Sequence, residues 1–441
     1  MNGTINGKIY DLIGVGLGPF NLGLAALLDQ TNLDCLFLEQ KPEFQWHPGL
    51  LIENSTIQVP FLADLVTMAD PCSPYSFLNY LHAQSRLYHF YFFEKFHIPR
   101  REYNHYCRWV SQQLNSCQFG QRVESLTLEN IDFETYYKIE SRELKTGKMN
   151  TYFAHHLVLG VGSIPQVPPC FQNIYSDHIF HSAEFLNRRD RALQSDSITV
   201  IGSGQSAAEV FYELLQQQSN YSYRLEWHTR SAGFLPMEYS KLGLEHFSPD
   251  YIDYFYHLPP QKRDRLLSEQ RLLYKGISFE TIADIYDLLY ERSIGGQPLN
   301  VRLLPLVEVK EVERVTTEKG DRFVLGYRHS QQETRFTHET DCVILATGYR
   351  HAIPRCIDGI RDLIQWDSRG RYEVKFDYRL ALNREISNHI FVQNGELHTH
   401  GIGAPDLGLG AHRNSVIINT LLGETVYPVE RRNVFQQFGV A

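Results

Sequence analysis

The feature that most constrains the fold is a pair of glycine-rich turns, each set between an apolar strand-like segment and a helix-like segment. The first follows residues 9–13 and reads Gly14-Val15-Gly16-Leu17-Gly18-Pro19, and the second follows residues 197–201 and reads Gly202-Ser203-Gly204-Gln205-Ser206-Ala207. In this context the backbone can approach a pyrophosphate, which the amides and positive dipole end of the following helix then bind. The pair predicts an α/β fold with two Rossmann-like dinucleotide-binding domains.

The segments after the two turns end differently, and the difference indicates which dinucleotide each turn binds. After the first turn, residues 34–38 read as a strand that ends in Glu39, where a carboxylate commonly binds a ribose hydroxyl. After the second turn, the strand-like residues 223–227 are followed by Arg230, whose guanidinium suits the 2′-phosphate of NADP. We therefore assign FAD to the first turn and NADPH to the second. Arg230 as a solvated loop charge, and a turn that binds nothing, are the simpler alternatives.

Two further strand-to-turn segments, 156–162 and 341–349, predict where the chain crosses between the domains. Two turns with two such crossings imply a FAD domain that is interrupted by an inserted NADPH domain. Residues 237–300 instead show helical apolar spacing and predict a small helical substrate-binding region. The expected units are FAD-binding residues 1–190, NADPH-binding residues 191–236, the helical region 237–300, NADPH-binding residues 301–340 and FAD-binding residues 341–441.

Composition excludes several classes of protein. The formal net charge is −9 without a basic run, which argues against nucleic-acid binding. The seven cysteines are scattered without a C-x-x-C pair, which favours free thiols over a disulfide frame or a zinc site, so no metal is expected. No apolar run approaches membrane-spanning length. We expect a soluble cytoplasmic protein.

With these pieces placed, the chain resembles the flavin-dependent N-hydroxylating monooxygenases, the lysine/ornithine N-monooxygenase group of siderophore biosynthesis. The resemblance covers nearly the whole chain. Its specific blocks, in order along the chain, are residues 14–22, Trp46-His47-Pro48-Gly49, residues 58–81, 202–209 and 341–349, and Thr399-His400-Gly401-Ile402.

The resemblance implies that NADPH reduces FAD, that O2 adds to the flavin C4a, and that the resulting hydroperoxyflavin hydroxylates a primary amine. By position, Trp46, His47 and Gln58 are the catalytic candidates that flank the flavin ring, although Trp46 could serve the core and His47 a loop. It also implies a homodimer or homotetramer. The residues expected to bind the cofactors are Gly14, Gly16, Gly18, Pro19, Phe20, Glu39, Gln40, Trp46, His47, Gln58, Gly202, Ser203, Gly204, Gln205, Ser206, Glu209, Arg230, Ala346, Thr347, Gly348, Tyr349, Leu407 and Gly408.

The chain departs from the family pattern where amino-acid substrates are held. The family lysine that pairs with the α-carboxylate is Ala63 here, the family serine after Thr-His-Gly is Gly408, and a family asparagine is Ser248. A buried carboxylate without its cation is costly, so this change disfavours an α-amino acid. We expect a decarboxylated amine, putrescine or cadaverine first, with histamine also a candidate.

A diamine needs an acceptor for its distal ammonium, and Asp406, Glu245, Asp250 and Glu280 are candidates among which the sequence does not choose. Alternatively, Lys241 or Lys275 takes over an α-carboxylate, and the chain is then an L-lysine N6- or L-ornithine N5-monooxygenase. The residues expected to bind the substrate are Ala63, Glu245, Ser248, Lys275, Asp406 and Gly408.

Other two-dinucleotide flavoproteins are the rival classes. A disulfide reductase would need a paired redox cysteine, which this sequence lacks. A Baeyer–Villiger or sulfide monooxygenase of the same broad class, and a flavin-binding protein without enzymatic activity, remain alternatives that product analysis and NADPH consumption would separate.

Overall fold

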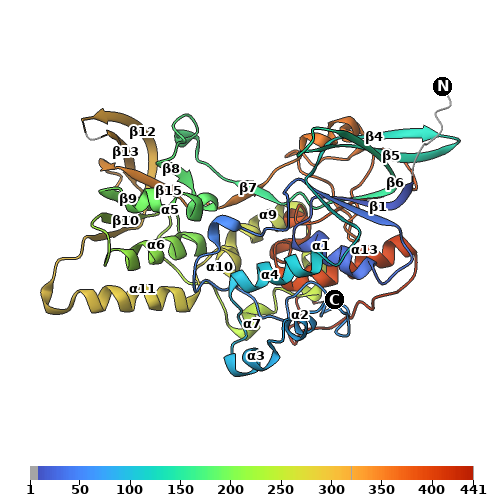
Figure 1. Ribbon diagram of the computed structural model, residues 1–441, viewed down its shortest axis with the longest axis horizontal. Helices are drawn as coiled ribbons and strands as arrows, with labels where there is room; N and C mark the ends of the chain where they lie inside the picture. The colour runs from blue at the N-terminus through green and yellow to red at the C-terminus, as the bar shows by residue number, and fades with distance from the viewer. Residues whose placement is uncertain (1–7, 319, 441) are drawn as a thin grey trace.

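The computed structural model describes residues 8–318 and 320–440, which form two lobes (Figure 1). Each lobe is built on its own parallel or mostly parallel sheet, and each glycine turn lies in a different lobe. The predicted α/β fold with two dinucleotide-binding units is thus confirmed. Within these ranges, no helix combines the length and the apolarity that crossing a membrane requires.

The first lobe contains a seven-stranded sheet in the order β3-β2-β1-β6-β5-β4, with β17 paired to β6. Helices α1, α4 and α13 pack together beside it, and α1 is buried on nearly all sides because its residues are almost all apolar. The parallel strands are β1 (Ile9–Val15), β2 (Cys35–Glu39), β3 (Cys117–Phe119), β6 (Met149–Leu159) and β17 (Ile390–Val392); β4 (Gln121–Ile131) and β5 (Glu134–Glu143) add an antiparallel hairpin, and the helices are α1 (Pro19–Leu28), α4 (Arg100–Ser111) and α13 (Gly410–Leu422).

The second lobe contains a five-stranded parallel sheet in the order β11-β10-β9-β15-β8. Helices α5 and α6 cover it, α11 packs on α6, and a three-stranded antiparallel sheet lies alongside. The elements are β8 (Ile179–His181), β9 (Ser197–Ile201), β10 (Arg224–His228), β11 (Val301–Leu304), β15 (Cys342–Leu345), α5 (Phe185–Leu193), α6 (Gln205–Gln217) and α11 (Phe279–Arg292), with β12 (Val307–Thr317), β13 (Gly320–His329) and β14 (Arg335–Thr340) in the small sheet.

The second sheet begins before residue 191 and extends past residue 340, which corrects two of the predicted domain boundaries. Val343 of β15 pairs with Ile179 of β8, and Cys342 pairs with Ile198 of β9. Both β8 and β15 were assigned to the first domain from sequence. A short, fully apolar strand has the same pattern in either sheet, so the pattern does not reveal which sheet it joins.

Residues 237–300 are helical as expected, but they do not form one unit. Helices α8 and α9 pack on α12 of the first lobe, whereas α11 packs on α6 of the second. The predicted single helical region is therefore divided between the lobes. Its elements are α7 (Lys241–Leu244), α8 (Pro249–Tyr256), α9 (Pro260–Glu269), α10 (Arg271–Tyr274) and α11, and α12 spans Leu397–His400.

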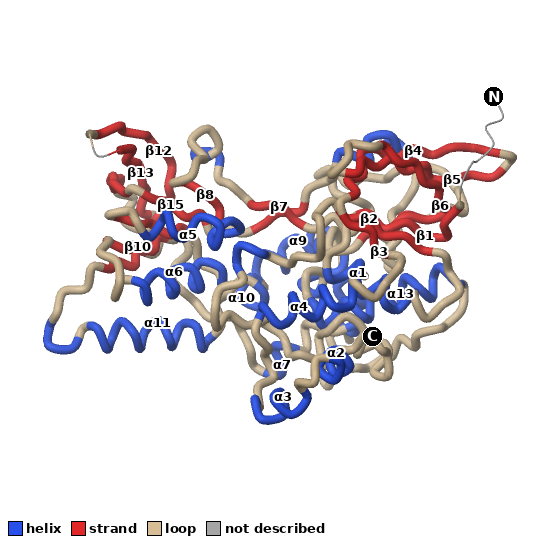
Figure 2. Tube along the Cα trace, viewed as in Figure 1, coloured by secondary structure: helices blue, strands red, loops and turns tan. Residues whose placement is uncertain are grey.

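Two antiparallel strands form one connection between the lobes (Figure 2). Strand β7 (Ser163–Pro165) follows β6 and leads out of the first lobe, and β16 (Tyr349–His351) follows β15 and leads back. These are the two crossings expected from residues 156–162 and 341–349. Below the connection, the short helices α2 (Phe77–Ala83) and α3 (Leu87–Phe93) project from the first lobe.

Candidate active site

The first glycine turn forms a cradle that larger residues would fill. Gly16 has φ +86°, and a Cβ there would lie 2.6 Å from the carbonyl oxygen of Gly160. A Cβ on Gly14 would lie 2.2 Å from the ring of Phe37. Around Gly18, which precedes α1, no described atom lies within 4 Å of the Cβ position. The start of α1 therefore has room for a phosphate group, as the dinucleotide assignment requires.

Side chains from distant parts of the sequence hold this turn in place. The Glu39 carboxylate accepts hydrogen bonds from the backbone N–H groups of Leu17 (2.8 Å) and Lys41 (2.9 Å). Asn21 donates to the carbonyl oxygen of Gly16 (2.7 Å) and accepts from Gln393 (2.9 Å). Gln393 follows β17 and was not predicted, because it lies 372 residues along the chain from Asn21 and no sequence pattern connects the two.

The second glycine turn is closed by the strand that leads back to the first lobe. A Cβ on Gly202 would lie 2.1 Å from the carbonyl oxygen of Ala346, so this position tolerates only glycine. The Ser231 hydroxyl donates to the Ser203 hydroxyl (2.9 Å), next to the exposed Arg230. Two hydroxyls and a cation beside a helix N-terminus are groups that suit a phosphorylated ribose.

Glu209 was expected to contact a cofactor, but its carboxylate is occupied by protein groups. Arg100 donates to both carboxylate oxygens, at 2.7 and 2.8 Å, and Gln205 donates to one of them at 3.0 Å. Arg100 and Glu209 come from α4 and α6, so this buried pair joins the two lobes. Its role in the described structure is to position the second lobe.

Trp46 and His47 form an aromatic cluster with Tyr349 of β16. The Trp46 and His47 ring centroids are 5.1 Å apart, and those of His47 and Tyr349 are 5.4 Å apart. Burial, helped by the nearby Arg100 cation, lowers the pKa of His47 to about 4, so the imidazole is neutral near pH 7. The Tyr349 hydroxyl is buried without a hydrogen-bond partner in the described ranges, as expected of a group that faces a ligand.

Gln58 joins the first lobe to residues 237–239. Its backbone carbonyl accepts a hydrogen bond from the Tyr239 hydroxyl at 2.9 Å, and its side-chain amide lies 3.9 Å from the sulfur of Met237. Burial raises the pKa of Tyr239 to about 12, and the carboxylates of Glu280 and Asp406 add to this effect. Tyr239 was not predicted, because a single tyrosine in a loop carries no distinguishing pattern.

Ala63, Gly408 and Asp406 lie together. A Cβ on Gly408 would be 3.7 Å from the Cβ of Ala63 and 2.9 Å from Oδ1 of Asp406. Asp406 also accepts a hydrogen bond from the backbone N–H of Gly408 at 2.8 Å. Burial raises the pKa of the Asp406 carboxyl to about 6. Two of the three positions that depart from the family pattern are thus adjacent, and Asp406 beside them is an acid.

Two of the other expected substrate residues have structural partners instead. The Glu245 carboxylate accepts hydrogen bonds from the N–H groups of Phe435 and Gln436, both at 3.0 Å. Ser248 caps α8 by accepting from the N–H of Tyr251 at 3.1 Å. Asp250 likewise accepts from Asn433 at 2.9 Å. Glu245 and Asp250 therefore bind the C-terminal segment.

Lys275, also expected at the substrate, lies at the second glycine turn. Its carbonyl oxygen is 3.6 Å from the Cβ position of Gly204, and its pKa is lowered by burial and by the cations Arg271 and Arg230. Among the described residues no hydrogen bond or ion pair joins Lys275 to Ala63 or Gly408, so its role as a replacement for the family lysine stays a prediction. The fold returns residues 275–278 across the start of α6, which the sequence spacing does not show.

The remaining predicted cofactor residues lie at the same two turns and crossings. Pro19 and Phe20 begin α1, Gln40 follows β2, and Ser206 is in the first turn of α6. Thr347 donates to the carbonyl of Gln166, and the Gly348 carbonyl hydrogen-bonds to His181 at 3.0 Å, so these two fix the crossing. Leu407 adjoins Gly408 in the 3₁₀ turn η7 (Leu407–Leu409).

One buried cluster in the second lobe has the composition of a metal site. Each of three buried residues offers one possible ligand atom, and these atoms lie within 4.8 Å of one another. The residues are Glu226, His228 and His338. However, Arg224 is 2.9 Å from the Glu226 carboxylate, and His228 hydrogen-bonds to Glu226 (2.9 Å) and Tyr327 (2.7 Å). A guanidinium in this place competes with a metal cation, so the cluster is accounted for as a hydrogen-bonded ion network.

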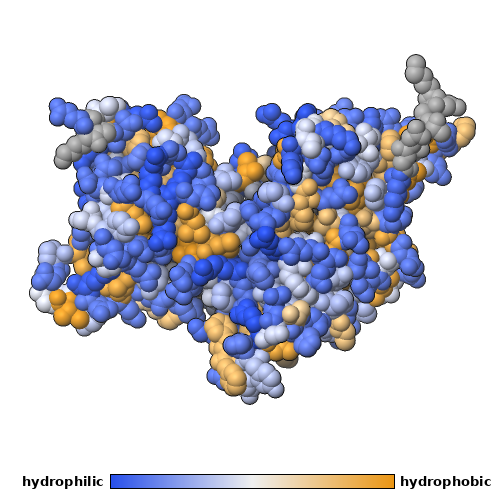
Figure 3. Space-filling model, in the orientation of Figure 1, coloured by the Kyte–Doolittle hydropathy of each residue, from blue (hydrophilic) through white to orange (hydrophobic). Residues whose placement is uncertain are grey.

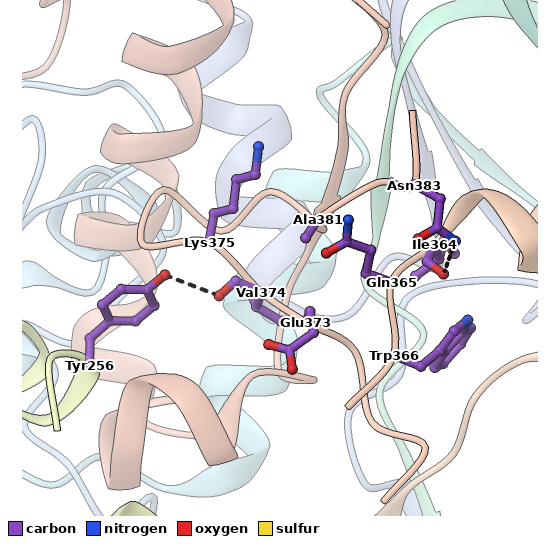
Figure 4. A pocket seen from close by; sticks show the side chains of 9 residues that line it. All are labelled: Tyr256, Ile364, Gln365, Trp366, Glu373, Val374, Lys375, Ala381 and Asn383. Atoms are coloured by element: carbon purple, nitrogen blue, oxygen red, sulfur yellow. Dashed lines mark hydrogen bonds between the residues drawn. The ribbon is translucent and has the colours of Figure 1, made fainter. Parts of the chain in front are cut away.

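A cavity of about 560 Å³ lies away from the predicted residues, between Tyr256 of α8 and residues 364–383 (Figure 4). The Tyr256 hydroxyl donates to the carbonyl of Val374 at its rim. None of the residues expected to bind a cofactor or substrate lines it, so the two glycine turns and the region around Gln58, Ala63 and Asp406 remain the candidate site.

Known proteins with this arrangement identify the class of enzyme. The chain is 46% identical over 435 residues to a putrescine N-hydroxylase of Shewanella oneidensis, covering 98% of this chain and 85% of that protein. It is 43% identical to a putrescine N-hydroxylase of Acinetobacter baumannii, covering 98% and 94%. The crystal structure of a cadaverine monooxygenase of desferrioxamine biosynthesis from Erwinia amylovora, bound to FAD, superposes with a TM-score of 0.93 at 43% identity, covering 99% of both chains.

A profile of the family described as L-lysine 6-monooxygenase/L-ornithine 5-monooxygenase matches residues 8–351. This range contains both glycine turns and both crossings, and the relatives extend the similarity to the rest of the chain. The chain therefore belongs to the L-lysine 6-monooxygenase/L-ornithine 5-monooxygenase family and is an N-hydroxylating monooxygenase.

Proposed function

We propose that this enzyme uses FAD, NADPH and O2 to N-hydroxylate a primary amine of a small diamine, putrescine or cadaverine, for hydroxamate siderophore biosynthesis. The relatives named putrescine N-hydroxylase and cadaverine monooxygenase support this substrate class. Histamine, which also lacks a carboxylate, is the next candidate.

The observation that carries the proposal is that Gly408 lies next to both Ala63 and the carboxylate of Asp406. An α-amino acid needs a cation for its carboxylate, and here the adjacent charged group is a carboxylate that would repel it. The same acid suits a substrate that ends in an ammonium group. The change from lysine to alanine thus removes a group that a diamine would not tolerate.

Asp406 is the acid that we assign to the distal ammonium. Glu245 and Asp250 already bind the C-terminal segment, and Glu280 is exposed. Asp406 lies at Gly408, which adjoins Ala63, and its charge helps to raise the pKa of Tyr239, whose hydroxyl donates to the carbonyl of Gln58. An ammonium bound at Asp406 places the other amine of a short diamine on the Gln58 side, where the family resemblance expects the flavin.

The protein residues position the reactants and exclude water. The first turn holds FAD and the second holds NADPH, while Trp46, neutral His47 and Tyr349 close the space between the lobes. Oxygen transfer is chemistry that the flavin supplies when it is bound. The amine reacts as its free base, so the rate should rise with pH as the amine loses its proton.

A homo-oligomer in the cytoplasm completes the proposal, and α3 is the surface that we assign to a second copy. Tyr88, Tyr91, Phe92 and Phe96 are 61–79% exposed on and just after α3, and the projection at the bottom of the space-filling view is partly hydrophobic (Figure 3). Four such side chains offer on the order of 500 Å² of aromatic surface, most of the roughly 800 Å² that each partner of a stable interface buries. Light scattering should give a multiple of the chain mass, and Tyr91→Glu with Phe92→Glu should give the monomer; an unchanged mass contradicts this surface.

An amine panel tests the catalytic proposal. NADPH oxidation and hydroxylamine formation should be coupled with putrescine and cadaverine, weaker with histamine, and nearly absent with lysine and ornithine. Coupled turnover of lysine or ornithine above that of the diamines would establish the alternative, an amino-acid N-monooxygenase. A ketone or sulfide oxygenation product without hydroxylamine would instead indicate another class of flavin monooxygenase.

A further inference from the structure

Three cations gather at the second glycine turn without an acid to balance them. Arg230, Arg271 and Lys275 form no ion pair within 4 Å and no side-chain hydrogen bond among residues 8–318 and 320–440. The chain carries more acidic than basic residues, and most of its other arginines do have acidic partners. An uncompensated group of cations is therefore a local exception.

The fold brings these cations together from separate elements. Arg230 follows β10, and residues 275–278 return across the start of α6. Ser278 donates its N–H to Gln205 at 2.7 Å, and the Lys275 carbonyl lies 3.6 Å from the Cβ position of Gly204. Backbone hydrogen bonds from Ile277 to Leu235 (3.1 Å) and from Met237 to Ile277 (2.8 Å) fix this segment to the loop that carries Arg230. Lys275 is thus held at the turn by rigid backbone contacts.

The electrostatic consequence is that the group lacks an anion. Burial and the charges of Arg271 and Arg230 lower the pKa of Lys275, so the two guanidinium groups repel the Lys275 ammonium in the described structure. A bound dianionic group converts this repulsion into attraction. The neighbouring hydroxyls of Ser203 and Ser231, 2.9 Å apart, add neutral hydrogen-bonding groups to the same place.

We propose that Lys275, together with Arg230, binds the 2′-phosphate of NADPH and sets the preference for NADPH over NADH. The backbone amides at the start of α6 bind the pyrophosphate. The side-chain cations near the end of β10 are then left to bind the 2′-phosphate. The inference rests on the cofactor assignment of the proposed function, but it does not depend on which amine is hydroxylated.

Binding measured at equilibrium tests the inference without turnover. The FAD-loaded enzyme is titrated calorimetrically with NADP⁺, NAD⁺ and adenosine 2′,5′-bisphosphate. In Lys275→Met, the Kd for NADP⁺ and for the bisphosphate should rise about tenfold or more, the loss expected for one charged hydrogen bond, while the Kd for NAD⁺ stays unchanged. Lys275→Arg should retain tight NADP⁺ binding and the preference over NAD⁺.

The control is Lys262→Met, an exposed lysine on α9 that should leave every Kd unchanged. Equal losses for NADP⁺ and NAD⁺ in Lys275→Met would overturn the inference by placing the lysine at the pyrophosphate, and unchanged Kd values would overturn it altogether. If Lys275→Met does not retain FAD, Lys275→Gln provides the same comparison. Failure of the wild-type enzyme to bind NADP⁺ would instead contradict the cofactor assignment itself.

Discussion

Arg100 of α4 and Glu209 of α6 form a bidentate ion pair between the two lobes, with N–O distances of 2.7 and 2.8 Å. Arg100 also donates to the carbonyl of Leu50 at 2.8 Å, and both side chains are at most 10% exposed. Glu209 lies one helical turn beyond Gln205, at the start of the helix that follows the second glycine turn. The position of that turn relative to the first lobe therefore depends on a buried charge pair.

Removing one partner of this pair should destabilise the protein strongly. Glu209→Gln leaves a buried guanidinium without a counter-charge, which costs about 3–5 kcal/mol in the free energy of unfolding. Arg101→Ala, on the same helix as Arg100, removes an exposed ion pair with Glu53 and should cost under about 1 kcal/mol. Urea denaturation compares the two variants, and similar losses would show that Arg100 and Glu209 do not hold the lobes together.

Substitutions in the two glycine turns should weaken the binding of FAD and of NADP⁺ separately. Gly16→Ala drives a Cβ to within 2.6 Å of a carbonyl oxygen at a positive φ, so the purified variant should lose most of its FAD. Gly202→Ala, in the second lobe, brings a Cβ within 2.1 Å of the carbonyl oxygen of Ala346. This variant should therefore retain FAD and bind NADP⁺ at least tenfold more weakly. Flavin absorbance and NADP⁺ titration measure the two effects. Loss of FAD from Gly202→Ala alone would contradict the assignment of the turns.

Asp406 should control the affinity for diamines in a pH-dependent way. Its pKa of about 6 means that the carboxyl group is ionised at neutral pH and becomes neutral as the pH falls through about 6. The KM for putrescine should therefore rise below pH 6, and Asp406→Asn should raise it at least tenfold at neutral pH and remove the dependence due to this group. Butylamine, which lacks the second ammonium, should show little change. If Glu280→Gln reproduces the effect while Asp406→Asn does not, the ammonium binds at Glu280.

Restoring the family lysine at position 63 should weaken the turnover of diamines. In Ala63→Lys, the new ammonium would lie close enough to pair with Asp406, and it would compete with the distal ammonium of putrescine. We expect a kcat/KM for putrescine at least tenfold lower. Ala63→Met, which adds similar bulk without charge, separates crowding from repulsion. Faster putrescine turnover in Ala63→Lys would refute the role of this position.

Acid should unfold the protein because several histidines are buried in the neutral form. Burial lowers the pKa values of His47 and His412 to about 4 and that of His400 to about 3. The unfolded chain binds these protons from about pH 6.5 downward, whereas the folded chain does not, so stability is complete above pH 6.5 and is lost as the pH falls toward 4. Each histidine contributes up to about 3 kcal/mol.

Asp406 acts in the opposite direction, since its raised pKa removes stability as the pH rises from about 3.8 to 6. The three histidines outweigh it, so the free energy of unfolding should fall between about pH 7 and 5. Urea unfolding at several pH values measures the slope. Substitution of the exposed His257 with Gln should leave the slope unchanged, whereas a flat profile in the wild type would show that the buried histidines are already charged.

The sequence predicted local units well and their partners poorly. Residues 237–300 were expected to be helical, and α11 is found there, because apolar spacing is a local signal and the cap at Ser278 is a local contact. The placement of β15 in the second sheet, of Lys275 at the second turn and of Glu209 against Arg100 depends on contacts between distant segments. Ala63 and Gly408 were singled out by comparison with a pattern, but only the fold shows that they are adjacent and that Asp406 lies beside them.

The pairing of β7 with β16 has a mechanical consequence. Two of the chain's passages between the lobes are strands that are hydrogen-bonded to each other along Ser163–Pro165 and Tyr349–His351. Any rotation of one lobe relative to the other must twist both strands together, so the ribbon acts as a single torsion spring rather than as two independent tethers. Tyr349 belongs to this ribbon and also contacts His47, so such a twist would be transmitted directly to the aromatic cluster.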